Sequence, residues 1–242
     1  MTKRKRNQKQ AIPEIKTYSV PFTLRETQEN ISINTNSQSK LSNERIINQA
    51  IQFHLNGNIP QATKYYQKLI SEGCNDHRVF CNYGVILQGL GKSQEAEYSF
   101  RKAIAIKSDF TDSHYNLGNI CSDLGKLEEA EMSYQKAIEL NPDYIEAHYN
   151  LGNTLKDLGK IENAELSYQK AIELNPKHVK SHLNLGNILK DLGKLKEAEN
   201  SYNKSIKMKP CFAEAYYSLS LLKFSDKKKL LQDLDKLKEA ET

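Results

Sequence analysis

Apolar and small residues along this chain recur with the spacing of an amphipathic helix. Within residues 145–178, a first group lies at steps of three and four residues: His148, Leu151, Gly152 and Leu155. A second group with helical spacing follows: Ala164, Tyr168, Ala171 and Ile172. Gly159 lies between the groups, where glycine suits the left-handed residue after a helix. Asn175-Pro176 ends the second group, because a residue before proline avoids the α region. The pattern predicts two helices joined by a tight turn.

This two-helix pattern recurs with a period of 34 residues. Four series keep the period: a first-helix glycine (Gly84, Gly118, Gly152, Gly186), a turn glycine (Gly57, Gly91, Gly125, Gly159, Gly193), a second-helix alanine (Ala62, Ala96, Ala130, Ala164, Ala198) and an aromatic residue (Tyr66, Phe100, Tyr134, Tyr168, Tyr202). One helix pair cannot bury its apolar face alone, so successive pairs must stack. Glycine costs about 1 kcal/mol relative to alanine inside a helix. We therefore expect the first-helix glycine to recover this cost by letting the two helices pack closely.

The motifs resemble those of the tetratricopeptide repeat family. The family's Leu-Gly pair appears as Leu117-Gly118, Leu151-Gly152 and Leu185-Gly186, and its closing proline as Pro142, Pro176 and Pro210. The resemblance covers roughly residues 43–242 and implies an all-α, right-handed superhelical solenoid of antiparallel helix pairs. The expected repeats are 43–76, 77–110, 111–144, 145–178 and 179–212, followed by a C-terminal capping helix pair over 213–242.

Both ends of the chain depart from the repeat pattern. The first unit has Ala50 in place of the glycine, and the last has Ser220 and lacks the turn glycine. In the cap, we expect three leucines to face inward: Leu230, Leu234 and Leu237. Residues 1–42 lack the periodicity and are predicted to form a disordered basic and polar tail. An apolar patch at residues 20–24 has the composition to dock on the first repeat.

Charge is concentrated at the N-terminus. The chain carries a formal net charge of +5, and residues 1–10 contain five basic and no acidic side chains, so the remainder is neutral. A nucleic-acid-binding domain carries a basic surface on its folded body, and we therefore expect no nucleic-acid partner. Residues 3–6 also fit a nuclear signal or an RNA contact, but a solvated tail is the simpler interpretation. We expect no membrane association, because no 18-residue apolar segment is present.

The cysteines bear on the cellular compartment. All four lack the spacing of a metal or redox motif, and no apolar segment of the signal-peptide type follows the basic start. These features predict a reduced, cytoplasmic protein.

Asparagine recurs on the side of the first helix opposite its buried face. At 100° per residue, positions 6 and 9 of a unit lie opposite positions 4, 7, 8 and 11. Position 6 holds Asn48, Asn82, Asn116, Asn150 and Asn184, and position 9 holds Asn119, Asn153 and Asn187. In the superhelix that the resemblance implies, this side lines the concave surface. We predict a groove along which asparagine side chains form a ladder.

An asparagine amide offers a carbonyl acceptor and an NH₂ donor, which complement the two groups of a peptide bond. Packed helices lie about 8–10 Å apart and an extended peptide rises about 3.3 Å per residue, so each repeat would meet roughly every third ligand residue. The ladder resembles the repeat domain of O-GlcNAc transferase, whose position-6 asparagines contact the substrate backbone. The alternative is that repeat duplication retained these asparagines without a ligand.

A second peptide-binding arrangement, the carboxylate clamp of co-chaperones, is matched only in part. The matching residues are Asn119, Asn150, Lys180 and Asn184. Tyr115 and Asn184 stand where the clamp has lysine and arginine. Binding to an acidic C-terminus is therefore disfavoured.

Three other series have alternative interpretations. Tyr115 and Tyr149, at position 5, either contact the ligand or only cover the neighbouring helix, and we favour ligand contact. The aspartates of the last turn (Asp123, Asp157, Asp191) either bind basic ligand groups or pair with lysines (Lys126, Lys160, Lys194), and we favour the pairing. Three histidines (His114, His148, His182) are expected to pack in the core, because different units cannot place imidazole nitrogens about 2.0–2.1 Å from one zinc ion.

The sequence shows no nucleophile–base pair, phosphate loop or metal cluster, so we expect no catalysis and no cofactor. The favoured function is a non-enzymatic adaptor that binds an extended segment of another protein. The alternative is a substrate-targeting component, or a truncated relative, of a repeat-linked glycosyltransferase or sulfotransferase, whose partner would be a group-transfer enzyme.

Overall fold

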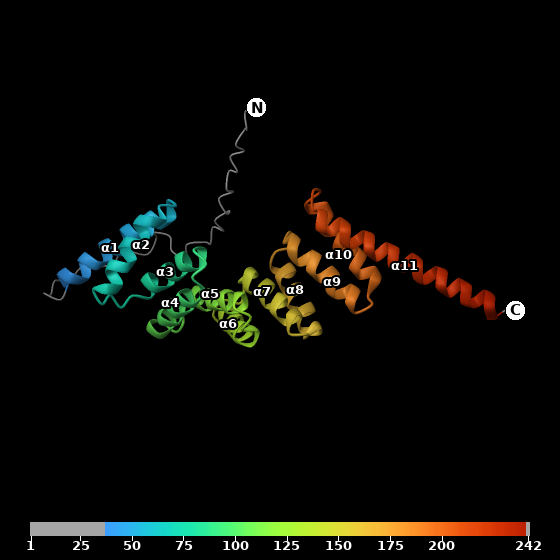
Figure 1. Ribbon diagram of the computed structural model, residues 1–242, viewed down its shortest axis with the longest axis horizontal. Coiled ribbons are helices and arrows are strands. Elements are labelled where there is room, and N and C mark those ends of the chain that lie inside the picture. Colours follow the sequence, from blue (N-terminus) through green and yellow to red (C-terminus); the bar gives the residue numbers. More distant parts are fainter. Residues whose placement is uncertain (1–36, 241–242) are drawn as a thin grey trace, which may run out of the picture. The chain divides into compact units, whose positions relative to one another are not determined.

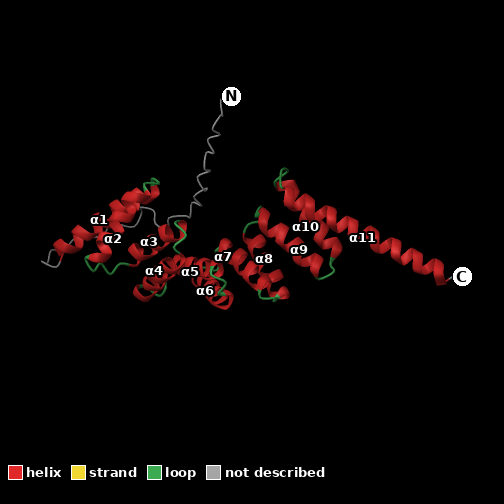
Figure 2. Ribbon diagram, viewed as in Figure 1, coloured by secondary structure: helices red, strands yellow, loops and turns green. Residues whose placement is uncertain are grey.

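The computed structural model describes the backbone of residues 37–240 and the side chains of residues 43–225 and 227. All regular structure in this part of the chain is α-helical (Figure 2). The helices, labelled in Figure 1, are α1 (Ser37–Leu55), α2 (Ile59–Ser71), α3 (His77–Gly89), α4 (Ser93–Ile106), α5 (Thr111–Asp123), α6 (Leu127–Leu140), α7 (Ile145–Asp157), α8 (Ile161–Leu174), α9 (Val179–Asp191), α10 (Leu195–Met208) and α11 (Ala213–Ala240). Consecutive helices pack as pairs from α1·α2 to α9·α10, which confirms the predicted repeat architecture.

The turn between the two helices of each pair is formed at the glycine. Gly159 has φ 74°, and its N–H donates to the Lys156 carbonyl at 2.9 Å. The next N–H, that of Lys160, reaches back to the Leu155 carbonyl at 2.8 Å. These bonds satisfy carbonyls that the end of α7 leaves unpaired. The predicted left-handed glycine turn is therefore confirmed.

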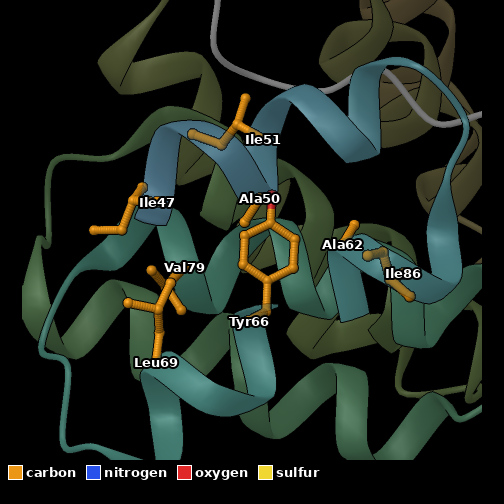
Figure 3. Packing of buried hydrophobic residues seen from close by; sticks show 8 residues of the cluster. All are labelled: Ile47, Ala50, Ile51, Ala62, Tyr66, Leu69, Val79 and Ile86. Carbon is orange, nitrogen blue, oxygen red and sulfur yellow. The ribbon is translucent and has the colours of Figure 1, made fainter. Parts of the chain in front are cut away.

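The described part of the chain divides into two compact units, with the boundary between Ser108 and Asp109. In the first unit, α1, α2 and α3 share a cluster of buried side chains: Ile47, Ala50, Ile51, Ala62, Tyr66, Leu69, Val79 and Ile86 (Figure 3). Arg78 on α3 binds Glu44 on α1 through two N–O contacts of 2.9 and 2.6 Å, and also binds Asp76 at 2.8 Å. This charged group joins the first and second repeats. Burial acts to raise the pKa of Asp76, but the Arg78 guanidinium holds it below its usual value.

The second unit, α5 to α11, is built around close contacts between a glycine and a tyrosine. A Cβ atom added to Gly152 would lie 2.7 Å from Cε1 of Tyr168. The same contact recurs between Gly118 and Tyr134 and between Gly186 and Tyr202. No side chain fits between these helices, which explains why the chain keeps a residue that is unfavourable for helix formation.

The histidines at position 4 anchor the loop that precedes their own helix. His148 and His182 are 8% and 4% exposed. Their Nε2 atoms lie 2.9 and 3.0 Å from the carbonyl oxygens of Pro142 and Pro176. Both therefore pack inside the repeats, as predicted.

Two boundaries differ from the sequence-based expectation. Helix α1 begins at Ser37, six residues inside the segment predicted to be a disordered tail. The expected capping helix pair over 213–242 is wrong, because α11 is one continuous helix from Ala213 to Ala240. Lys227 stands where the other units have the turn glycine, so no left-handed residue interrupts the helix. The N-terminal basic run, the apolar patch at 20–24 and the side chains of the cap leucines lie outside the described residues.

Candidate functional site

The asparagines at position 9 form hydrogen bonds with the tyrosine of their own repeat. The hydroxyl groups of Tyr134, Tyr168 and Tyr202 donate to Oδ1 of Asn119, Asn153 and Asn187 at 2.8, 2.8 and 2.9 Å. Each bond joins the first helix of a pair to the second. It also orients Oδ1 of the asparagine toward the second helix of the same repeat.

The asparagines at position 6 extend these bonds to the preceding repeat. Asn150 donates from Nδ2 to Oδ1 of Asn119 at 2.9 Å and to the Tyr115 hydroxyl at 3.2 Å. Asn184 repeats this arrangement, with 2.8 Å to Asn153 and 3.4 Å to the Tyr149 hydroxyl. Oδ1 of Asn119 and Oδ1 of Asn153 thus accept two hydrogen bonds each, whereas Oδ1 of Asn187 accepts one, from Tyr202. We call this set of tyrosines and asparagines on α5 to α10 the amide network.

The amide network uses one end of each amide and leaves the other end without a bond. Among the described residues, Nδ2 of Asn119 and Asn153 and Oδ1 of Asn150 and Asn184 form no hydrogen bond. Each pair of repeats therefore keeps one NH₂ donor and one carbonyl acceptor, which are the groups that pair with a peptide bond. The sequence predicted amides open at both ends, and the intramolecular bonds correct this.

The second-helix tyrosines of the amide network, Tyr134, Tyr168 and Tyr202, are fixed as hydrogen-bond donors. Desolvation by burial raises the pKa of Tyr202 to about 12. Burial is also the main cause that raises the pKa of Tyr134 and Tyr168. All three hydroxyls therefore keep their protons at neutral pH and hold the asparagine oxygens as acceptors.

Tyr115 and Tyr149 pack against the residue that immediately precedes the first helix of the following repeat. The Tyr115 ring lies 4.7 Å from that of Tyr144, and the Tyr149 ring lies 5.1 Å from that of His178, measured between centroids. Both side chains are half-buried. They cover the neighbouring helix while their hydroxyls accept from the amide network, so direct ligand contact by their rings stays a prediction.

The first unit arranges the same positions differently. Asn82 is fully buried, and Asn116, at the start of the second unit, is 6% exposed. Burial removes both from a surface that a ligand can reach. Position 9 holds Ile51 and Val85 in place of asparagine. Asn48 is half-buried, so it is the remaining first-unit candidate.

Asp157 and Asp191 pair with adjacent lysines, and not with Lys160 and Lys194 as predicted. Lys160 and Lys194 instead bind Glu131 and Glu165 of the preceding repeat at 2.6 and 2.8 Å. Asp157 and Asp191 lie 3.4 and 3.7 Å from the neighbouring Lys156 and Lys190, and both carboxylates are about half exposed. Their position places negative charge at the end of the first helix, beside the amide network.

The 34-residue period predicts the asparagine positions but not their bonds to the tyrosines. A signal was present in four of the five repeats, where position 9 and the aromatic position change together; the first repeat, with Ile51 and Tyr66, is the exception. Asn119, Asn153 and Asn187 each accompany a tyrosine, whereas Val85 accompanies Phe100, which has no hydroxyl.

The amide network consists of amide and phenol groups, which bind by hydrogen bonding. They resemble neither a hard-metal site nor an activated nucleophile.

Stacked helix pairs tied together by such recurring bonds define an all-helical repeat protein. A family model described as TPR repeat matches residues 118–159 and 186–225. Models described as tetratricopeptide repeat match residues 77–110, 145–178 and 167–200. The chain belongs to the tetratricopeptide repeat family. None of the described helices is long and apolar enough to cross a membrane.

Solved structures share this fold. YrrB, described as a TPR protein with an unusual peptide-binding site, is 21% identical with a TM-score of 0.66, over 76% of this chain and 97% of YrrB. A tetratricopeptide repeat protein from Parabacteroides merdae is 25% identical with a TM-score of 0.66, over 81% of this chain and 79% of its own. MamA from Desulfovibrio magneticus RS-1 is 20% identical with a TM-score of 0.64, over 71% of this chain and 97% of that one. No curated protein sequence matches the chain.

Proposed function

We propose that this protein is a non-enzymatic adaptor that binds an extended segment of another protein along α5, α7 and α9. The observation that carries the proposal is the pair of unbonded amide ends that each junction of the amide network presents. Nδ2 of Asn119 or Asn153 would donate to a ligand carbonyl, and Oδ1 of Asn150 or Asn184 would accept from a ligand N–H.

The amide network supports this function because it orients the amides before a ligand arrives. Each asparagine is already held by hydrogen bonds of 2.8–2.9 Å, so binding costs little additional side-chain entropy. The acceptors and donors recur once per repeat. Binding through the backbone of the ligand selects ligands by their extended conformation more strongly than by their side chains.

Two further observations favour a peptide ligand. The half-exposed carboxylates of Asp157 and Asp191 lie at the end of the same helices and would favour basic side chains in the ligand. YrrB, which shares the fold, is described as having a peptide-binding site.

A test must separate binding from folding, because alanine at these positions would also break the amide network. Asn119→Asp with Asn153→Asp keeps the oxygen that accepts from tyrosine and Asn150 or Asn184, but replaces the free NH₂ by an oxygen. We expect peptides selected from a fluorescein-labelled random library to bind the double variant at least ten-fold more weakly by anisotropy, with the melting temperature unchanged.

The matched control changes two exposed asparagines on second helices, Asn163→Asp and Asn203→Asp. It adds the same charge away from the amide network and should retain full binding. Equal affinity of the Asn119/Asn153 variant and the unaltered protein would refute the proposal, as would a library that yields no binder.

A further inference from the structure

Three large apolar side chains lie exposed along one side of α11. Tyr217, Leu221 and Phe224 are 65%, 46% and 71% exposed, and we call them the apolar stripe. At 100° per residue, they lie opposite Ala215 and Leu222, which are 0% and 5% exposed on a helix that packs against α10 and α9. The apolar stripe is therefore not the side by which α11 is held to its own chain.

The apolar stripe occupies the same side of its helix as the amide network does in the preceding repeats. Tyr217 stands at position 5, as Tyr149 does on α7, and Leu221 stands at position 9, as Asn153 does. Phe224 stands at position 12, which is lysine in α7 and α9. The side that presents hydrogen-bonding groups along α5, α7 and α9 is therefore apolar on α11.

The last amide before the apolar stripe has more open bonding capacity than the others. Oδ1 of Asn187 accepts from the Tyr202 hydroxyl at 2.9 Å, and no second donor reaches it among the described residues. Oδ1 of Asn153 also accepts from Asn184 of the next repeat. In α11 that position holds Ser218, whose side chain is shorter and does not form this bond. Asn187 therefore keeps a free NH₂ donor and a second acceptor site on its carbonyl oxygen.

The two features together indicate what kind of ligand fits. An amide that is open at both ends complements a peptide bond, and the apolar stripe is stabilised by burial under apolar side chains. A small apolar molecule would leave the Asn187 amide without partners, and a purely polar segment would leave the apolar stripe in water. In an extended peptide, side chains two residues apart point to the same face, so one segment can satisfy both.

We propose that Asn187 and the apolar stripe form a subsite for large apolar side chains, such as leucine or phenylalanine, near one end of the extended ligand. This inference rests on the proposed function, because the same segment passes along α5, α7 and α9 before it reaches α11. With roughly three ligand residues per repeat, the apolar residues lie about three residues beyond the peptide group that Asn184 contacts. The amide network binds the backbone of the ligand, and this subsite adds preference for its sequence and fixes its register.

Peptides selected by the unaltered protein from the fluorescein-labelled random library test the subsite. We expect leucine, isoleucine or phenylalanine to be enriched near one end of the selected peptides. The variant Leu221→Gln with Phe224→Gln keeps good helix formers and should lose this enrichment. The matched control is Met132→Gln with Leu166→Gln, at side chains that are 67% and 64% exposed on α6 and α8. It should select the same peptides as the unaltered protein.

A double-mutant cycle on one selected peptide measures the contact directly. Serine in place of its apolar end residues should weaken binding to the unaltered protein at least ten-fold by anisotropy. The same change should weaken binding to the Leu221→Gln/Phe224→Gln variant less than two-fold. Asn187→Asp keeps the acceptor for Tyr202 but removes the free NH₂, and it should weaken binding of both peptides.

The outcomes separate this inference from the proposed function. Selected peptides without apolar enrichment, or equal losses on serine substitution in both proteins, would overturn the subsite and leave the adaptor function standing. Binding that depends on the apolar stripe but not on Asn119 and Asn153 would support the subsite and refute the amide network as the backbone-binding site. A library that yields no binder would overturn both.

Two other occupants of the apolar stripe give distinct results. A helical circular dichroism signal from the bound peptide would replace the extended segment by an amphipathic helix. A dimer in sedimentation velocity that the Leu221→Gln/Phe224→Gln variant dissociates would assign the apolar stripe to a second copy of the chain. Either result would overturn the proposal.

Discussion

At the scale of single residues, position 9 decides whether the buried tyrosine hydroxyl has a partner. Asn153 accepts from Tyr168, whereas Ile51 stands at the same position beside Tyr66. Asn82 is the polar neighbour of the Tyr66 hydroxyl, but neither the hydroxyl nor the Asn82 amide forms a hydrogen bond of acceptable geometry among the described residues. The first junction thus buries polar atoms without compensation, which costs about 1–3 kcal/mol per group.

This difference predicts opposite effects for one chemical change. Tyr66→Phe removes an unpaired buried hydroxyl, so the free energy of unfolding should stay constant or rise by up to about 1 kcal/mol. Tyr168→Phe removes a paired hydroxyl and should lower it by about 1 kcal/mol. Urea unfolding followed by circular dichroism measures both. Equal losses in the two variants would mean that the Tyr66 hydroxyl is satisfied after all.

At the scale of elements, the distance between the two helices of a pair is set by a tyrosine ring that packs directly on a glycine backbone. The Cβ atom of an alanine at 152 would lie 2.7 Å from the Tyr168 ring. That ring cannot easily move, since it is fully buried and its hydroxyl is bonded to Asn153. Gly89, at the end of α3, has no atom within 4 Å of its equivalent position.

Alanine at these two glycines should therefore act in opposite directions. Gly152→Ala gains helix propensity, but the clash costs about 1–3 kcal/mol, so we expect a net loss of stability. Gly89→Ala gains up to about 1 kcal/mol, because it meets no neighbour. Thermal melts of the two variants test this. A Gly152→Ala protein as stable as the Gly89→Ala protein would show that the helices can separate without cost.

The helix pairs, their turns and the packing of His148 and His182 were predictable from the sequence, because each depends on spacing within one repeat. The bonds of the amide network were not predicted, because they depend on which end of an amide faces the next repeat. The continuity of α11 was missed as well. The leucine spacing after Lys227 predicted a second helix, but the turn glycine is absent. Nothing else at Lys227 favours a left-handed backbone, so the helix continues.

At the scale of the whole molecule, stability is the sum of similar repeats and the contacts between neighbours. In the second unit, the two junctions between complete repeats combine the amide network with an ion pair, Lys160–Glu131 or Lys194–Glu165. The lysines are 46% exposed, so each pair contributes about 0–1 kcal/mol. The stability of the first unit depends more on the ion pairs of Arg78 and on buried aromatic rings than on hydrogen bonds between asparagines.

Acid should weaken the fold through the first repeat. Burial lowers the pKa of His54 to about 4, from about 6.5 in an unfolded chain. The folded state excludes a proton that the unfolded state binds, so stability is complete above pH 6.5 and falls as the pH drops toward 4. Between pH 7 and pH 5 the loss from His54 is about 2 kcal/mol.

Urea unfolding at pH 7 and pH 5 measures this loss. In a His54→Leu variant, which cannot be protonated at this position, most of the difference between the two pH values should disappear. The same pH dependence in the variant and the unaltered protein would assign the effect to other groups, such as His178 and His182, whose pKa values are also lowered by burial.

Identical bonding at successive junctions makes the number of repeats adjustable. In-frame loss of residues 145–178 would join Asn184 to Asn119 and Lys194 to Glu131, and each new neighbour offers the atoms of the one it replaces. Duplication of the same stretch would likewise create matched junctions. Unequal recombination within such a gene can thus lengthen or shorten the binding surface by whole repeats. Every junction between repeats would keep its hydrogen bonds and its ion pair.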